Sequence, residues 1–293
     1  MREIFATTRI YKVFATFFGS LMAIWAYTAS GAEPWPPVLH PNPAVQPPEW
    51  DWQLVTPVRL NPDSNIKIYN IDMFDNEDSG AVEMLHAHGK RVICYISVGS
   101  WEDWRDDAAD FPRSILGVTY TGYPDERWLD IRDVNPKKSK TGMKLAQILL
   151  KRFQRAQEMG CDAVEPDNMD GYDTSSHEST GFPLTYEDQI YFNLWLADAV
   201  QGLGMAVALK NNVGQARDPR IYTTFDFVVS EQCFQYKECD AFSEFLALNK
   251  PVFEAEYSLS PSKFCPKAKA SRISAIKKRT SLNASRADCS AYY

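Results

Sequence analysis

Carboxylate residues follow several apolar, β-rich runs of the chain, and two of them are the first candidates for chemistry. Asp167 lies at the end of the run 161–167, and Glu231 lies at the end of the run 225–231. A carboxylate beside such a run is costly to bury unless it is paired or hydrogen-bonded, and function is one reason to tolerate that cost. Glycoside cleavage needs two carboxylates in a cleft that restricts water. One attacks the anomeric carbon or activates water, and the other protonates the leaving oxygen.

A structural role is the alternative for these acids, because Asp and Asn after strands commonly cap helices. For a single such residue that interpretation is the better one. Here acids follow five of the β-rich runs, and amides and one lysine occupy similar positions. Such a density of polar groups at equivalent positions favours a functional site.

Aromatic residues lie at or just beyond the same run ends, where sugar rings could stack on them, although any one of them could belong to the core. They are Trp101, Trp104, Tyr123, Trp128, Tyr172 and Tyr257. The combination of acids and aromatic rings strengthens the carbohydrate interpretation.

Motifs of other hydrolases are missing, since the sequence contains neither GxSxG nor HExxH. The acids could bind a hard cation such as calcium, but no EF-hand spacing is present. Zinc is not expected, because no CxxC pair occurs and the four histidines are scattered. We therefore expect no metal and no cofactor. A metal-dependent hydrolase that uses the same acids stays as an alternative, which loss of activity on chelation would reveal.

Eight β-rich runs alternate with helical patterns after residue 50. The runs are 51–55, 66–73, 91–99, 127–131, 161–167, 205–211, 225–231 and 251–256, and helical spacing occupies 78–89, 137–159, 186–203 and 240–249. Alternation of this kind indicates an α/β protein with a parallel sheet and helices outside it, and eight strands predict a single (β/α)8 TIM-type barrel. Catalytic groups in such a barrel sit at the C-terminal ends of the strands.

The two ends of the chain differ from this region. Residues 1–32 have the build of a secretory signal, with basic residues, a 15-residue apolar run over 13–27 and small residues before Glu33. That run is shorter than the ~20 residues that span a bilayer, which favours cleavage over retention as an anchor. Residues 33–49 read as a proline-rich linker, 50–260 as the barrel and 261–293 as a basic tail.

The six cysteines agree with an oxidising compartment. Cys233 with Cys239, and Cys265 with Cys289, are plausible local disulfides, the second within the tail. Cys94 and Cys161 lie in apolar strand patterns, and we interpret both as buried hydrophobic residues.

Five ordered motifs carry a family resemblance. They are YNIDMFDN (69–76), VICYISVGSWE (92–102), RWLDIR (127–132), GCDAVEPDN (160–168) and SEQC (230–233). The chain resembles glycoside hydrolase family 114, the endo-α-1,4-polygalactosaminidases, over about residues 50–257. The resemblance implies a (β/α)8 barrel that cleaves α-1,4-linked galactosamine polymers with retention of anomeric configuration.

Carried over by position, Asp167 and Glu231 are the expected catalytic pair, with Asp167 as nucleophile and Glu231 as acid/base. Glu165 and Asp170 are the nearest alternatives to Asp167. The expected substrate contacts are Asp72, Tyr95, Trp101, Glu165, Asn168, Asp170, Lys210 and Glu256.

The formal net charge of −7 argues against nucleic acid as a partner. Galactosamine with a free amine is cationic near neutral pH, and acids in the cleft would attract it. The candidates for pairing with its ammonium group are Asp72, Asp75, Glu165 and Asp170. We expect a secreted, extracellular monomer with no stable membrane association after signal cleavage. A non-catalytic carbohydrate-binding barrel is the alternative function.

Overall fold

The computed structural model describes residues 35–61, 64–175 and 178–292. The predicted signal peptide at 1–32 lies outside the described residues.

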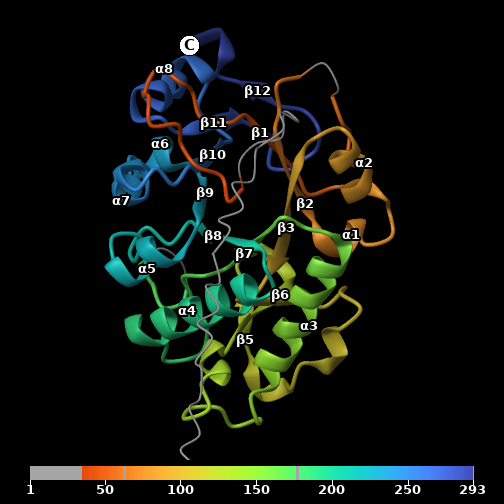
Figure 1. Cartoon of the computed structure of the whole chain (residues 1–293). Coiled ribbons are helices and arrows are strands. Elements are labelled where there is room, and N and C mark those ends of the chain that lie inside the picture. The colour runs from red at the N-terminus through yellow and green to blue at the C-terminus, as the bar shows by residue number, and fades with distance from the viewer. Residues whose placement is uncertain (1–34, 62–63, 176–177, 293) are drawn as a thin grey trace, which may run out of the picture. The chain divides into compact units, whose positions relative to one another are not determined.

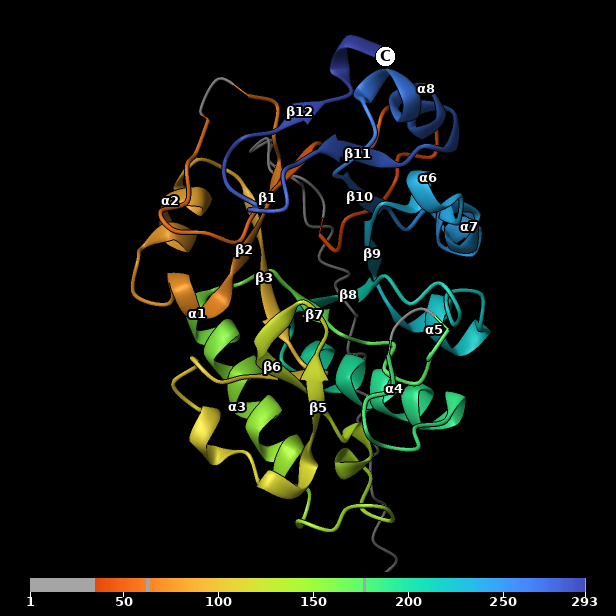
Figure 2. The same ribbon diagram turned by 180° about the vertical axis from the view of Figure 1, so that it is seen from behind.

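Eight parallel strands form the main sheet of the described chain (Figures 1 and 2). In sheet order they are β1 (Trp50–Gln53), β2 (Ile68–Asp72), β3 (Arg91–Ser97), β7 (Ala163–Asp167), β8 (Ala206–Lys210), β9 (Phe227–Glu231), β10 (Val252–Glu256) and β11 (Ser274–Lys277). A short strand, β12 (Ala287–Asp288), pairs antiparallel with β11.

The first and last parallel strands, β1 and β11, lie next to each other and are joined by side-chain contacts. The indole Nε1 of Trp50 on β1 donates to the carbonyl oxygen of Ser274 on β11 at 2.9 Å. Beside this contact, the Lys278 ammonium lies 2.8 Å from Asp51 Oδ1, and both side chains are buried. The structure confirms the predicted single (β/α)8 barrel.

Helices follow most of the barrel strands. They are α1 (Met73–Asn76), α2 (Ala81–Ala87), α3 (Lys144–Met159), α4 (Tyr186–Gly202), α5 (Pro219–Thr224), α6 (Cys233–Tyr236), α7 (Ser243–Ala247) and α8 (Pro261–Ser271). Short 3-10 helices are η1 (Ala108–Asp110), η2 (Arg113–Ile115), η3 (Ile131–Val134), η4 (Cys239–Phe242) and η5 (Ser290–Tyr292). The four predicted helical segments contain α2, α3, α4 and α7. Within the described ranges, no helix combines the length and apolar character needed to span a bilayer.

Side chains alternate between two cores along each strand. One core fills the barrel interior and includes Trp52, Ala208 and Val229. The other lies between the strands and the helices and includes Val207 and Val228. Because the period is two residues, the position of an acid within its strand decides whether it faces the interior or the helices.

Residues 127–131 do not form the predicted fourth barrel strand. They overlap β6 (Tyr123–Leu129), which pairs with β4 (Ser100–Glu102) and β5 (Leu116–Tyr120) in a separate antiparallel sheet. β3 instead pairs directly with β7.

The eighth barrel strand is β11, so the barrel sheet extends past residue 260, where we expected the tail to begin. Residues Ser274, Ala275 and Ile276 of this four-residue strand are buried. The basic residues around the strand leave no apolar run long enough to predict it from the sequence.

Cys94 and Cys161 form a disulfide, so their interpretation as plain buried hydrophobic residues is wrong. Cys94 lies on β3 and Cys161 just before β7, and these strands are neighbours, which brings the two Cα atoms to 6.0 Å. The expected disulfides Cys233–Cys239 and Cys265–Cys289 are both present.

Replacing both Cys94 and Cys161 with Ala should lower the free energy of unfolding more than replacing both Cys233 and Cys239. The first disulfide spans 67 residues and the second 6, for which the chain-entropy model gives about 4 and about 2 kcal/mol. Guanidinium chloride unfolding of the two double variants and the wild type measures the difference. An equal loss in both variants would contradict the expectation.

Candidate active site

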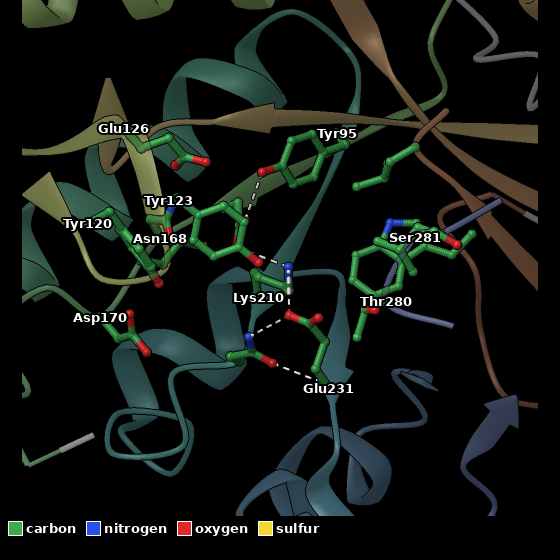
Figure 3. Close-up of a pocket in the computed structure, with 16 residues that line it drawn as sticks. Tyr95, Tyr120, Tyr123, Glu126, Asn168, Asp170, Lys210, Glu231, Thr280 and Ser281 are labelled. Atoms are coloured by element: carbon green, nitrogen blue, oxygen red, sulfur yellow. Dashed lines mark hydrogen bonds and ion pairs between the residues drawn. The ribbon is translucent and has the colours of Figure 1, made fainter. Parts of the chain in front are cut away.

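A polar cavity of about 430 Å³ lies at the C-terminal ends of the barrel strands (Figure 3). Acids, aromatic rings and amides line it, together with a segment that follows β11. The lining residues are Trp52, Leu54, Tyr95, Tyr120, Tyr123, Glu126, Asp167, Asn168, Met169, Asp170, Lys210, Asn211, Glu231, Thr280, Ser281 and Leu282.

Lys210 is the central charge of this cavity. Its side chain is only 2% exposed, and its Nζ lies 3.0 Å from Asp167 Oδ1, 3.1 Å from Glu165 Oε1 and 3.3 Å from Glu231 Oε2. Burial alone would lower the pKa of Lys210, but the three carboxylates hold it well above its ordinary value. The lysine is therefore a fixed positive charge that the three acids share.

Asp167 is held as an anion. Burial would raise its pKa, but the Lys210 ammonium and a hydrogen bond of 2.8 Å from the Tyr95 hydroxyl bring the pKa below its ordinary value. Burial and the Asp167 charge raise the pKa of Tyr95, so its hydroxyl keeps the hydrogen that it donates. The Asp167 side chain is 20% exposed, so a ligand can reach it.

Glu231 faces Asp167 across the Lys210 ammonium. Its carboxylate accepts hydrogen bonds from the Tyr257 hydroxyl at 2.6 Å and from Asn211 Nδ2 at 3.2 Å. Asn211 Oδ1 also accepts from the backbone N–H of Glu231 at 2.9 Å, so one amide fixes both the strand end and the acid. The Glu231 side chain is 29% exposed, so a ligand can reach it too.

Glu165 lies behind Lys210 and does not line the cavity. Its side chain is fully buried, and Asn70 Nδ2 donates to its Oε2 at 2.5 Å. Burial raises the pKa of Glu165 to about 7, against the lowering effect of Lys210. Glu165 helps to raise the pKa of Lys210, but it cannot contact a sugar unless the cavity rearranges.

The structure brings together most of the predicted site residues. The predicted residues that line the cavity are Tyr95, Asp167, Asn168, Asp170, Lys210 and Glu231. Their strands place alternate residues on the interior face, which explains why Asp167, Lys210 and Glu231 converge.

Besides Glu165, three predicted contact residues lie away from the cavity lining. Asp72 caps α1 and pairs with Arg105 at 2.7 Å. Trp101 donates from its indole to the carbonyl oxygen of Ala108 at 3.0 Å. Glu256 is buried on the outer face of β10, where its Oε1 accepts from the backbone N–H groups of residues 234 and 235.

Sequence reasoning did not select several lining residues. Tyr120 and Glu126 belong to the β5–β6 hairpin, which we had read in part as a barrel strand. Trp52 and the segment 280–282 come from the two ends of the barrel. Of the six aromatic residues expected near the strand ends, Tyr123 lines the cavity, and Tyr257 contacts Glu231.

Within the described ranges, no group of three or more His, Cys, Asp or Glu side chains is arranged to hold a metal ion. The side chains that line the cavity supply carboxylates, hydroxyls, amides and one ammonium group.

Two partly exposed carboxylates at the strand ends of a (β/α)8 barrel are the groups that a glycoside hydrolase uses. The chain belongs to glycoside hydrolase family GH114, whose family model matches residues 35–292.

Solved structures agree with this assignment. The crystal structure of Aspergillus fumigatus Ega3 in complex with galactosamine is 32% identical in sequence, with a TM-score of 0.72 over 88% of this chain and 98% of that one. The glycoside hydrolase domain of PelA from Pseudomonas aeruginosa shares the fold, with 13% identity and a TM-score of 0.59 over 82% of this chain and 98% of that one. No curated protein sequence matches the chain.

Replacing Lys210 with Met should move the acid limb of the kcat/KM profile for glycoside cleavage to higher pH. The ammonium keeps the pKa of Asp167 low, so without it Asp167 ionises only at higher pH, by ~1–3 units. The measurement is kcat/KM against pH.

Tyr95→Phe serves as the graded comparison, because it removes one hydrogen bond and no charge. It should shift the same limb in the same direction by less. If the acid limb of both folded variants stays at the wild-type pH, Lys210 and Tyr95 do not lower the pKa of Asp167.

Proposed function

We propose that the protein is an endo-acting hydrolase of α-1,4-linked, partly deacetylated galactosamine polymers and that it retains anomeric configuration. The observation that carries the proposal is the placement of Asp167 and Glu231 on one ammonium group in an open cavity. Family membership and the similarity to Ega3, which was solved with galactosamine, support the choice of substrate.

The spacing of the two acids supports retention. Asp167 Oδ1 lies 3.0 Å and Glu231 Oε2 3.3 Å from the same nitrogen, so these oxygens cannot be farther apart than the two distances laid end to end. Inverting enzymes separate their carboxyl groups by ~6.5–9.5 Å to admit a water, and retaining enzymes by ~5–5.5 Å. The contact of both acids with one ammonium group therefore favours the shorter, retaining separation.

The environment of Asp167 supports its role as nucleophile, and the role of Glu231 as acid/base is carried over from the family resemblance. Asp167, held ionised by Lys210 and Tyr95, attacks the anomeric carbon, while Glu231 gives its proton to the leaving oxygen. A β-linked glycosyl ester on Asp167 results. Glu231 then takes a proton from water, the water oxygen attacks the same carbon, and the ester bond breaks to restore the Asp167 carboxylate.

The acids proposed to pair with the substrate's ammonium groups differ in availability. Asp72 and Asp75 both contact Arg105, at 2.7 and 3.3 Å, and Glu165 contacts Lys210. Asp170 is the one of the four that lines the cavity. Of these four acids, Asp170 is therefore the one placed where a bound polymer would meet it.

Secretion and a monomeric state belong to the same proposal. Three disulfides support an oxidising compartment, and the sequence pattern of residues 1–32 supports export.

Asp167→Asn and Glu231→Gln should each reduce release of soluble oligosaccharides from partly deacetylated α-1,4-galactosamine polymer by ~10³-fold or more, because each removes a reacting group. Mass spectrometry of the products measures the release. Glu158→Gln, an exposed acid on α3, is the matched control and should equal wild type. If wild type binds the polymer and releases nothing, the alternative of a non-catalytic binding barrel replaces the proposal.

Azide rescue separates the two roles on an α-galactosaminide with a good leaving group. In Asp167→Ala, azide takes the place of the nucleophile and should give the β-glycosyl azide. In Glu231→Ala, azide attacks the ester on Asp167 and should give the α-glycosyl azide. NMR identifies the anomers, and the opposite pairing of variant and anomer would exchange the roles.

A further inference from the structure

Three side chains of the β5–β6 hairpin line the cavity, although the hairpin is not part of the barrel. Figure 3 shows Tyr120, Tyr123 and Glu126 together on one side, with Glu231, Thr280 and Ser281 on the other. Tyr123 is 58% exposed, and Tyr120 stacks on Trp128 with ring centroids 4.6 Å apart. The hairpin thus presents a braced aromatic surface beside a carboxylate.

Glu126 is held in a fixed position relative to the end of β7. The Ser100 hydroxyl donates to its Oε2 at 2.8 Å. Asn168 Nδ2 in turn donates to the hydroxyl oxygens of Ser100 and Ser97 at 3.0 and 3.2 Å. Asn168 follows Asp167 directly, so this chain of hydrogen bonds ties Glu126 to the reacting end of the barrel.

The chain at the start of the hairpin sheet passes so close to the end of β7 that position 99 requires a glycine. A Cβ built on Gly99 would lie 1.8 Å from the carbonyl oxygen of Asn168. The backbone N–H of Gly99 also donates to the carbonyl oxygen of Asp167 at 3.2 Å. The base of the hairpin sheet is therefore packed directly on the strand that carries Asp167.

Glu126 differs from the other acids around it because no cation neutralises it. Asp167 and Glu231 share Lys210, and Glu102 pairs with Arg105 at 2.9 Å. Among the described residues Glu126 forms no ion pair, and the hydroxyl of Ser100 is its hydrogen-bond donor. A half-buried carboxylate without a cation, on the wall of an open cavity, is an incomplete pair that a cationic ligand would complete.

We propose that Tyr120, Tyr123 and Glu126 form an amino-sugar subsite, in which the tyrosine rings stack on a sugar ring and Glu126 accepts hydrogen bonds from its protonated amine. An exposed aromatic ring can pack on the C–H face of a sugar ring, and a carboxylate can pair with its ammonium group. The inference rests on the proposed function and deepens it, since it assigns the preference for deacetylated polymer to one residue outside the barrel.

The electrostatics of Glu126 are consistent with this role. Burial raises its pKa to about 7, the Ser100 hydrogen bond lowers it, Glu102 and Asp167 raise it, and Arg105 lowers it. Pairing with an ammonium requires the ionised form, so the preference for the deacetylated polymer should strengthen as the pH rises through about 7. It should weaken again where the sugar amine loses its proton.

Glu126→Gln tests the subsite, because it keeps the shape and removes the charge. With fully deacetylated polymer it should raise KM about tenfold with little change in kcat, as expected for loss of one charged hydrogen bond. With N-acetylated polymer KM should stay at the wild-type value. Asp125→Asn, an exposed acid on the same strand outside the cavity lining, is the matched control and should leave both substrates unaffected.

Two further variants guard against a general structural effect. Glu126→Asp should restore part of the preference for deacetylated polymer. Tyr123→Ala, at an exposed position, should raise KM for both polymers alike, because stacking does not depend on acetylation. An unchanged KM in Glu126→Gln, or an equal loss on both polymers, would overturn the subsite. Failure of the wild type to cleave either polymer would overturn the proposed function itself.

Discussion

One buried ammonium group organises the reacting end of this barrel. Lys210 contacts Asp167, Glu165 and Glu231 within 3.3 Å, and its Nζ lies 4.8 Å from the ring centroid of Trp52. Three carboxylates placed so closely without a cation would repel one another and would take up protons. With the lysine present, two of them can stay exposed to a ligand while the third remains buried.

The barrel supplies this arrangement through the strand pleat, and the hairpin supplies the opposite wall. Asp167, Lys210 and Glu231 each end a strand whose alternate residues fill the interior. The hairpin follows β3 and meets β7 at Gly99 and Asn168. The reacting groups and the proposed recognition groups therefore come from different parts of the fold and share one point of attachment.

The sequence predicted the barrel and most of its strands because their apolar runs are long enough to read. It missed β11, where four residues with only two apolar side chains lie among lysines and arginines. Counting residues 127–131 as a barrel strand preserved the number eight but separated β3 from β7. That error also hid the Cys94–Cys161 disulfide, since the two cysteines are close only when those strands are neighbours.

The candidate site, like the fold, was predicted only in part from the sequence. Strand-end logic located Asp167, Lys210 and Glu231, whose strands show clear alternation. It also selected Glu256, although on β10 the interior face carries Phe253 and Ala255, so Glu256 faces α6 instead. Glu126 could not be selected from strand ends, because its place in the cavity depends on how a separate sheet folds back on the barrel.

The closing strand has a consequence for synthesis on the ribosome. β1 is made early, but its neighbour β11 and the cavity segment 280–282 are made more than 200 residues later. Until β11 emerges, Trp50 and Asp51 have an open sheet edge beside them, which is a site for aggregation. The barrel can therefore complete its fold only after nearly the whole chain has been synthesised.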